Sequence, residues 1–157
     1  MPMRIGDAMP PLDGATSWFN GSLEEITESI KGKPTLVHFW AVSCGICKDK
    51  MPQLNDIKAK YGALGLQTVA VHMPRYEADT DLETVREAIE ANKIVEPTAV
   101  DSLHKLKDAF LNEQGWVPVY YLFDAEGKLK TRAAGEFGIS VLQTALDKMF
   151  APQGAAA

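Results

Sequence analysis

Cysteine and long apolar runs are scarce in this chain of 157 residues, and each scarcity excludes a class of protein. Only two cysteines occur, Cys44 and Cys47, and a bridge across so short a loop hardly restricts the unfolded chain, which excludes a disulfide scaffold. The longest apolar stretch, residues 117–123, is far shorter than the ~20 residues of a membrane-spanning helix. Residues 1–5 lack the apolar core of a signal peptide. We therefore expect a cytoplasmic protein without a membrane span, or an extracytoplasmic one if a leader has been removed.

Basic charge is also limited. The chain carries 16 Lys and Arg against 21 Asp and Glu, a formal net charge of −5, so its surface does not attract phosphate backbones and we expect no nucleic-acid partner. Hydrophobic residues make up 46% of the sequence, enough to bury one core in a chain of this length. We expect one domain over residues 1–151 that acts as a monomer, followed by a disordered tail over residues 152–157.

Predicted strands and helices alternate along the chain. β-branched and aromatic runs predict strands, and apolar residues at helical spacing predict the helices. The predicted strands are residues 35–40, 66–72, 97–100, 117–123 and 128–134, and the predicted helices are residues 22–31, 47–62, 79–93, 103–110 and 139–150. Short connections between alternating elements imply right-handed crossovers. The sequence therefore predicts an α/β fold with a central mixed, mostly parallel sheet flanked by helices.

Helix starts and the N-terminal segment carry further local signals. Ser22 with Glu25, and Ser140 with Gln143, match the capping-box pattern and predict helices that begin after each serine. Residues 1–20 contain several prolines and glycines. They are predicted to wrap the domain as an extended leader without regular structure of its own.

The two cysteines open a predicted helix directly after a strand, in the segment FWAVSCGICK at residues 39–48. At a helix start, free N–H groups and the helix dipole stabilise a thiolate, so Cys44 is predicted to be an acidic, accessible nucleophile. Cys47 lies one turn further in and is predicted to be less exposed. Because two intervening residues let the sulfurs meet, Cys47 can resolve a mixed disulfide by attacking Cys44. We expect this redox-active Cys44–Cys47 disulfide to work without a cofactor.

Other interpretations of the cysteine pair stay open at this point. Both cysteines could be ordinary buried residues, or they could bind a metal. A structural zinc site usually takes four protein ligands, and the three histidines are far apart in sequence, so no metal is expected. Peroxide could oxidise Cys44 in a peroxidase or redox sensor, with Cys47 as the resolving thiol. A non-catalytic binding module is a further alternative, which the intact pair argues against.

Several segments resemble the thioredoxin fold family. Residues 39–48 resemble the thioredoxin active-site segment, with Pro52 at the position where that family has a kink in the helix. Residues 115–123, GWVPVYYLF, resemble the cis-proline loop of the family and the strand that follows it. The strand and helix predicted between residues 97 and 110, together with the N-terminal extension, resemble the ResA/TlpA branch of thiol–disulfide oxidoreductases.

The resemblance implies a fold, an activity and a set of site residues. It implies a thioredoxin fold with an extra strand–helix insertion and an N-terminal extension. It also implies a protein-disulfide reductase that acts on protein disulfide substrates and receives electrons from an upstream thiol reductant. The Val117–Pro118 bond is expected to be cis, with the Val117 backbone facing the substrate, and Gly45 and Ile46 are expected to face it as well. Trp40 is expected either to shield the sulfurs or to pack in the core.

The sequence departs from thioredoxins beside the cysteines. His38 stands where thioredoxins have a buried aspartate, so the carboxylate proposed as a base for the resolving thiol is absent. A neutral His38 could accept the proton of Cys47, or it could be a buried histidine that only bonds a neighbouring backbone group. Ser43 stands where thioredoxins have a tryptophan, which changes the surface beside the cysteines.

The segment after the second predicted strand reaches the same edge of the sheet. His72 and Arg75 either line a substrate groove there or lie in a solvated loop. Glu77, Asp79 and Asp81 are predicted to be a charge cluster at the start of a helix, since no calcium-binding loop accompanies them.

Overall fold

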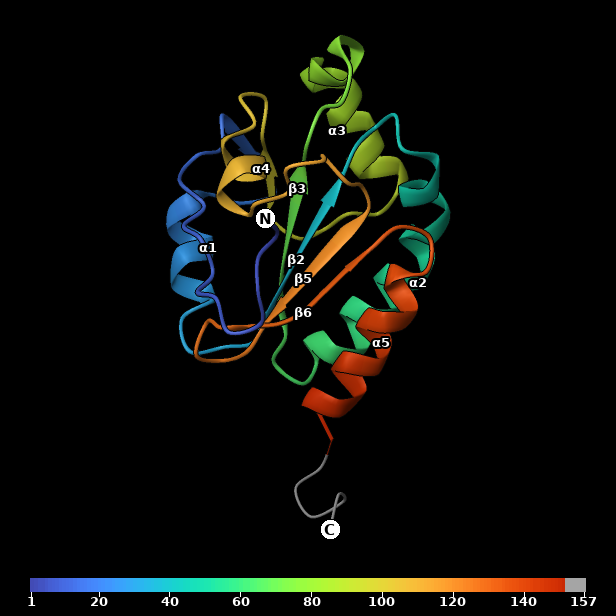
Figure 1. The fold of residues 1–157 in the computed structure, drawn as a ribbon. Coiled ribbons are helices and arrows are strands. Elements are labelled where there is room, and N and C mark those ends of the chain that lie inside the picture. The colour runs from blue at the N-terminus through green and yellow to red at the C-terminus, as the bar shows by residue number, and fades with distance from the viewer. Residues whose placement is uncertain (152–157) are drawn as a thin grey trace.

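A six-stranded sheet runs through the centre of the structure, a computed structural model that describes residues 1–151 (Figure 1). The strands are β1 (Ser17–Phe19), β2 (Thr35–Trp40), β3 (Gln67–His72), β4 (Thr98–Val100), β5 (Val119–Phe123) and β6 (Leu129–Ala134). Their order across the sheet is β1-β4-β3-β2-β5-β6. The disordered tail expected at residues 152–157 lies outside the described residues.

Helices cover both faces of this sheet (Figure 1). They are α1 (Leu23–Ser29), α2 (Gly45–Gly62), α3 (Leu82–Ala91), α4 (Lys105–Ala109) and α5 (Gly138–Met149), with a 3₁₀ turn, η1 (Glu77–Thr80), before α3. α2 packs against α5 on one face, and α1 and α4 lie on the other (Figure 1). The side chain of Asn55 in α2 donates to the Asn92 carbonyl after α3 at 3.0 Å, so α3 lies beside α2. The α/β architecture predicted from the alternation of elements is confirmed.

Parallel pairing is confined to the middle of the sheet. β2 pairs with β3 and β3 with β4 in parallel, whereas the pairs β1–β4, β2–β5 and β5–β6 are antiparallel. The sheet is mixed, as predicted, but parallel pairing is less extensive than expected among the described strands. β2 has a neighbour on each side, and all of its residues are buried. The ends of β2 and β3 and the start of β5 therefore meet at one edge of the sheet, where α/β proteins usually place their sites.

The prediction that the N-terminal segment lacks regular structure is wrong. Ser17–Phe19 form β1, which pairs antiparallel with β4. Without β1, the strand β4 would be an edge with unpaired backbone groups, so the leader covers it. Earlier in the leader, the Gly6 N–H donates to the Leu129 carbonyl and the Met9 N–H to the Gly127 carbonyl, each at 2.8 Å. Backbone hydrogen bonds thus hold this segment despite its prolines and glycines.

The two predicted capping boxes have different outcomes. The Ser22 side chain accepts a hydrogen bond from the Glu25 N–H at 3.2 Å, so the start of α1 is confirmed. Ser140 lies inside α5, which begins at Gly138 without a side-chain cap, so that prediction is wrong. A Cβ atom at Gly138 would lie 3.3 Å from the Tyr120 ring. The start of α5 is therefore set by its close approach to the sheet.

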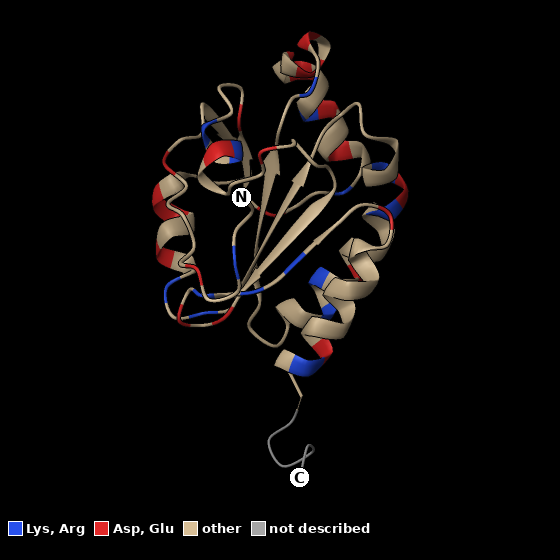
Figure 2. Ribbon diagram, in the orientation of Figure 1, with Lys and Arg blue, Asp and Glu red and all other residues tan. Residues whose placement is uncertain are grey.

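The sheet carries almost no charge. Strands β1 to β5 contain no Lys, Arg, Asp or Glu, and the charged residues gather on the helices, the loops and β6 (Figure 2). On the face covered by α4, the rings of Phe39, Phe110 and Tyr121 pack edge to face, with centroids 5.2 to 5.7 Å apart. Such aromatic pairs contribute roughly 0.5–1.5 kcal/mol each beyond their burial. This rigid apolar layer fixes the loops at the edge of the sheet.

Candidate active site

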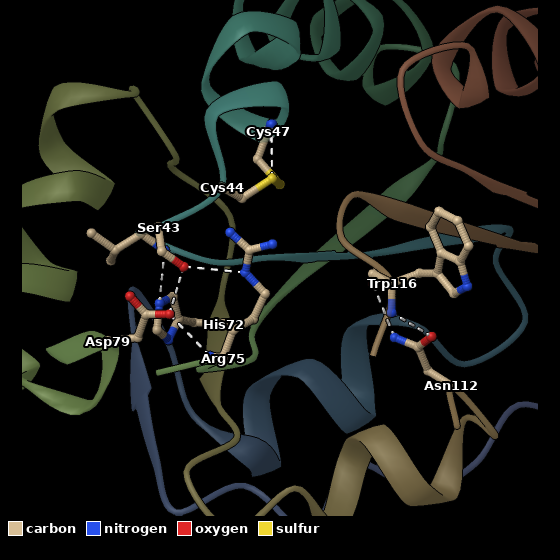
Figure 3. Close-up of a disulfide and its surroundings, with 9 residues drawn as sticks. Ser43, Cys44, Cys47, His72, Arg75, Asp79, Asn112 and Trp116 are labelled. Atoms are coloured by element: carbon tan, nitrogen blue, oxygen red, sulfur yellow. Dashed lines mark hydrogen bonds between the residues drawn. A yellow bond between two sulfur atoms is a disulfide. The ribbon is translucent and has the colours of Figure 1, made fainter. Parts of the chain in front are cut away.

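The two cysteines lie at the start of α2 and are joined by a disulfide (Figure 3). Their Cα atoms are 5.3 Å apart. Cys44 is the N-cap residue of α2, and the Cys47 N–H donates to its sulfur, with an N–Sγ distance of 3.0 Å. The turn after β2 therefore places the Cys44 sulfur where free N–H groups and the helix dipole favour negative charge.

Both cysteines are buried in this oxidised form, each only 3% exposed. The prediction that Cys44 is accessible and Cys47 less so is therefore wrong for the disulfide-bonded state. The bond joins the Cys44 sulfur to that of Cys47, which belongs to the buried face of α2. Gly45 and Ile46, between the cysteines, are exposed, so they form part of the surface next to the sulfur atoms.

The loop before β5 reaches the same edge of the sheet. Because β5 pairs antiparallel with β2, and Val119 stands opposite Phe39, the residues before Val119 lie beside the end of β2. The Val117–Pro118 peptide bond is cis. Val117 is 9% exposed and lies at the boundary between core and surface. The loop is thus placed beside the cysteine turn by strand pairing.

A buried asparagine anchors this loop (Figure 3). The Asn112 Oδ1 atom accepts the N–H of Trp116, and the Asn112 Nδ2 atom donates to the Trp116 carbonyl, both at 3.0 Å. Asn112 is fully buried, whereas Trp116 is 48% exposed. The side chain of Asn112 therefore replaces the strand pairing that the Trp116 backbone lacks.

Hydrogen bonds tie the residue before Cys44 to the loop after β3 (Figure 3). The Ser43 hydroxyl donates to the Asp79 carboxylate at 2.7 Å, and the Arg75 Nε atom donates to the Ser43 oxygen at 3.2 Å. The same Asp79 oxygen accepts the N–H groups of Arg75 and Tyr76, at 3.0 and 3.3 Å. Burial raises the pKa of Asp79, but these hydrogen bonds outweigh it and leave the pKa below its usual value. Asp79 is therefore an ionised anchor for both loops.

The predicted helix over residues 79–93 is interrupted, because η1 ends at Thr80 and α3 begins at Leu82. Asp79 lies in η1 and is only 4% exposed. The predicted charge cluster at a helix start is confirmed, since Glu77 and Asp79 lie in the first turn of η1 and Asp81 is the N-cap of α3, although Asp79 also accepts hydrogen bonds from two loops.

His72, at the end of β3, is fully buried, so neither a groove-lining role nor a solvated loop describes it. Its Nε2 atom accepts the Val42 N–H at 3.2 Å, so the ring hydrogen lies on Nδ1, which has no partner among residues 1–151. Burial lowers the pKa of His72 to about 4, although Asp79 opposes this shift. The ring is therefore neutral at pH 7. Trp40 is 1% exposed and packs edge to face on His72, with centroids 4.8 Å apart.

His38, in β2, belongs to a buried charged cluster. Its Nε2 atom lies 2.5 Å from one Glu96 oxygen, and the Lys58 ammonium lies 2.5 Å from the other. Burial raises the pKa of Glu96, but His38 and Lys58 outweigh it and lower the pKa to about 2. Burial lowers the pKa of His38, with Glu96 opposing. The cluster thus holds an ionised Glu96 and a neutral His38, whose Nε2–H donates to the carboxylate and whose Nδ1 carries the lone pair of the ring.

Sequence reasoning missed Lys58, Glu96 and Asn112. Glu96 is separated from His38 by 58 positions, and it precedes a proline at the start of a strand, where a solvated turn residue is the ordinary expectation. The sequence predicts that a buried His38 bonds a backbone group, but its partner in the structure is the Glu96 side chain. The side chains of His38, Lys58 and Glu96 come together only because the loop before β4 packs against α2.

The reactive group at this edge of the sheet is the disulfide between Cys44 and Cys47. Within residues 1–151, no group of three or more His, Cys, Asp and Glu side chains is placed to hold a metal ion. In the same part of the chain, no helix is both long and apolar enough to cross a membrane. The arrangement at the sheet edge can exchange a disulfide for a dithiol, with one N–H aimed at the sulfur of Cys44.

Known proteins are similar to this chain over most of its length. The family model described as Redoxin matches residues 5–146. The chain is 42% identical over 149 residues to the thiol-disulfide oxidoreductase YkuV of Bacillus subtilis, which covers 95% of this chain and 98% of YkuV. It is 27% identical over 153 residues to the thiol-disulfide oxidoreductase ResA of Oceanobacillus iheyensis, which covers 96% of this chain and 74% of ResA.

Solved structures share the fold. The solution structure of a thioredoxin-like protein in the oxidized form matches with a TM-score of 0.81 at 42% identity, over 94% of this chain and 97% of that one. The thioredoxin fold and the resemblance to the ResA branch are thereby confirmed. The Cys44–Cys47 disulfide supplies the redox pair that such enzymes require. The chain therefore belongs to the Redoxin family, as a thioredoxin-fold thiol–disulfide oxidoreductase.

Proposed function

We propose that this chain reduces disulfides in protein substrates, with Cys44 as the attacking thiol and Cys47 as the resolving thiol. The Cys44 thiolate attacks one sulfur of the substrate disulfide, a mixed disulfide forms, and the other substrate sulfur leaves as a thiolate. Cys47 then loses its proton and attacks the Cys44 sulfur. The remaining substrate sulfur leaves, the Cys44–Cys47 disulfide forms, and two electrons have passed to the substrate. An upstream thiol reductant restores the dithiol.

The hydrogen bond from the Cys47 N–H to the Cys44 sulfur carries this assignment of roles. After reduction, the same N–H and the helix dipole stabilise a thiolate on Cys44 and lower its pKa. Cys47 lies inside the first turn, on the buried face of α2, whereas the N-cap position that receives this N–H belongs to Cys44. A thiolate at Cys44 is therefore the nucleophile at neutral pH.

The substrate-binding surface in this proposal is formed by Gly45, Ile46, Val117 and Pro118. A Cβ atom at Gly45 would meet nothing within 4 Å, so a substrate backbone has room to approach. β5 begins at Val119, so the Val117 backbone precedes the strand and is available to an extended substrate segment. Trp40 supports this surface from the core, and Pro52 supports it from within α2.

His38 is proposed to accept the proton of Cys47 during the resolving step. It lies under α2, the helix that carries Cys47, because Lys58 of that helix shares Glu96 with it. The Nδ1 lone pair of a neutral imidazole is a suitable acceptor at pH 7. The alternative is that His38 only holds Glu96 in place. The variant His38→Gln separates the two roles, since glutamine can donate to Glu96 but has no basic nitrogen.

We assign the reaction to a monomer in the cytoplasm, with no cofactor besides the redox-active disulfide. In that compartment disulfides are usually transient and catalytic, and the pair is kept reduced by thiol systems. The reduction potential decides the direction: a value near that of thioredoxin, about −270 mV, makes the protein a reductant, and a value near about −120 mV makes it an oxidant. Equilibration of the pair with glutathione buffers of known potential measures it.

Insulin reduction with dithiothreitol as the donor tests the proposed activity. Wild type is expected to reduce insulin faster than the donor alone, and Cys44→Ser or Cys47→Ser to abolish the gain. Cys47→Ser is expected to accumulate mixed disulfides with protein substrates and Cys44→Ser not to, since only the resolving step is lost in the former. No gain over the donor contradicts the proposal, and equal trapping by both variants reverses the roles. Peroxide consumption without insulin reduction points to a peroxidase instead.

A further inference from the structure

We propose that a cationic pocket beside the disulfide binds an acidic side chain of the substrate, so that the enzyme prefers disulfides flanked by Asp or Glu; this inference rests on the proposed function. The pocket is a cavity of about 280 Å³ between the loop after β3, the start of α4 and the loop before β5. Its lining includes Arg75, Lys107 and His104 and no Asp or Glu. We call it the Arg75 pocket.

The Arg75 pocket touches both segments of the active site. Arg75 donates to Ser43, the residue directly before Cys44 (Figure 3). Gly115, which also lines the pocket, lies two positions before Val117 in the loop that we propose to bind the substrate. A substrate segment that lies across Cys44 and the Val117 backbone therefore passes the mouth of the pocket.

The two cations of the pocket form no direct ion pair with a carboxylate of the described chain. Among residues 1–151, neither Arg75 nor Lys107 has a carboxylate within 4.0 Å. The Lys107 ammonium donates to the backbone carbonyl of Glu113, at 3.1 Å. The ionised Asp79 offsets part of the Arg75 charge, but it reaches the guanidinium only through the Ser43 hydroxyl, because its bonded oxygen accepts that hydroxyl and two backbone N–H groups. In a chain of net charge −5, two such cations beside a reactive sulfur form a local attractor for anions.

The pocket is also held in shape. The Arg75 guanidinium lies 5.5 Å from the centre of the Tyr76 ring and is bonded at Nε, which leaves its outer N–H groups for a carboxylate. His104 donates from Nε2 to the Pro74 carbonyl at 2.8 Å, which links the start of α4 to the loop after β3. Gly115 has a φ of +67°, and a Cβ atom there would lie 3.5 Å from the Lys107 side chain. The lack of a side chain at Gly115 thus keeps the cavity open.

A carboxylate on an amino-acid side chain fits these properties best. Cofactor and drug-sized sites are typically ~300–1,000 Å³, so this cavity suits one side chain more than a larger ligand. A planar guanidinium recognises a carboxylate through two parallel N–H groups. The same chemistry is offered by a free C-terminus, so the test must separate these two sources.

Peptide disulfides with blocked ends and with Glu, Gln or Lys on either side of one cysteine test the proposal. We expect wild type to reduce the Glu peptide with a kcat/KM about tenfold higher than the Gln peptide at low salt, and the Lys peptide more slowly still. The ratio of kcat/KM for the Glu peptide to that for the Gln peptide should fall to about two in the Arg75→Gln variant. In the double variant that combines Arg75→Gln and Lys107→Gln, it should fall to about one. It should also fall with added salt, because the pocket is open to solvent.

Lys105→Gln is the matched control, since Lys105 is an exposed residue of α4 outside the pocket. It should leave the wild-type ratio unchanged. A ratio near one in wild type, or a tenfold ratio that survives in the double variant, overturns the proposal for the pocket. In either case, reduction of all peptides still supports the proposed function. Reduction of no peptide removes the proposed function and the role of the pocket with it. A preference that appears only when the peptide C-terminus is free assigns the pocket to a terminal carboxylate and overturns the side-chain assignment.

Discussion

The two buried histidines, His38 and His72, lie on neighbouring strands and differ in what surrounds them. His38 bonds an ionised Glu96 that also pairs with Lys58, so it belongs to a charged cluster under α2. His72 accepts one backbone N–H from the active-site loop and has an unpartnered Nδ1 atom within the described residues. Burial lowers the pKa of both rings.

Burial makes both histidines neutral, whereas their hydrogen-bond partners decide what each ring can do. A ring that donates to a carboxylate keeps its second nitrogen for a proton, as we propose for His38. A ring that accepts a backbone N–H acts as a support, as His72 does for Val42. The two regions should therefore respond to different mutations and in different pH ranges.

Removing the carboxylate of the His38 cluster should have the largest effect. Glu96→Leu leaves the Lys58 ammonium and the His38 N–H without their buried partner, so we expect the free energy of unfolding in urea to fall by about 3–5 kcal/mol. Glu87→Leu, on the exposed side of α3, is the control and should change it by less than about 0.5 kcal/mol. Equal costs for the two variants would show that the buried cluster adds no stability.

The pH dependence of stability should separate the regions next. The pKa of His72 is about 4 in the folded chain against 6.5 ordinarily, so below pH 6.5 the unfolded chain binds a proton that the folded chain does not. Stability is therefore full above pH 6.5 and falls by about 3 kcal/mol as the pH drops to 4. Urea unfolding of the oxidised protein between pH 7 and 4 measures this loss.

The variant His72→Gln should flatten that pH profile in part, because His38 shifts in the same direction and remains. The stability that Glu96 contributes is present above its ordinary pKa of 4.5 and is lost as the pH falls toward 2. A wild-type profile that is flat between pH 6.5 and 4 would contradict the neutral, buried state of His72.

Catalysis should depend on the ring of His38. We expect His38→Gln to slow insulin reduction on the order of 100-fold at pH 7, which is the lower end of the range for a general base. At higher pH the rate of the variant should partly recover, because Cys47 then ionises without a base. Rates measured from pH 6 to 9 test this. A pH profile that matches wild type assigns His38 to a positioning role for Glu96.

The smallest effect is expected at the edge of the His72 region. Ser43→Ala removes one hydrogen bond to Asp79 and one from Arg75 at an exposed residue, so we expect a loss of about 0.5–1 kcal/mol in unfolding free energy. Ser140→Ala, in the exposed part of α5, is the control with no side-chain bond in the described chain. A cost for Ser43→Ala close to that of Glu96→Leu would remove the contrast between the two regions.

Much of the fold follows from local patterns. The β2 segment was predictable because its run of β-branched and aromatic residues fits a strand covered on both faces. α1 was predictable from one serine and one glutamate at capping distance. β1 was not, because three residues without a periodic pattern become a strand only when β4 offers its unpaired edge.

Local patterns were enough to predict that Cys44 and Cys47 open a helix after a central strand, since strand, turn and helix are adjacent in the sequence. Only tertiary packing selected the distant side chains that bond the residues around this segment. Glu96 reaches His38, and Asp79 reaches Ser43, through packing of loops that are remote in sequence. The physical reason is that helix and strand patterns act over a few residues, whereas the partner of a buried polar group is chosen by whichever loops the completed sheet and helices bring together.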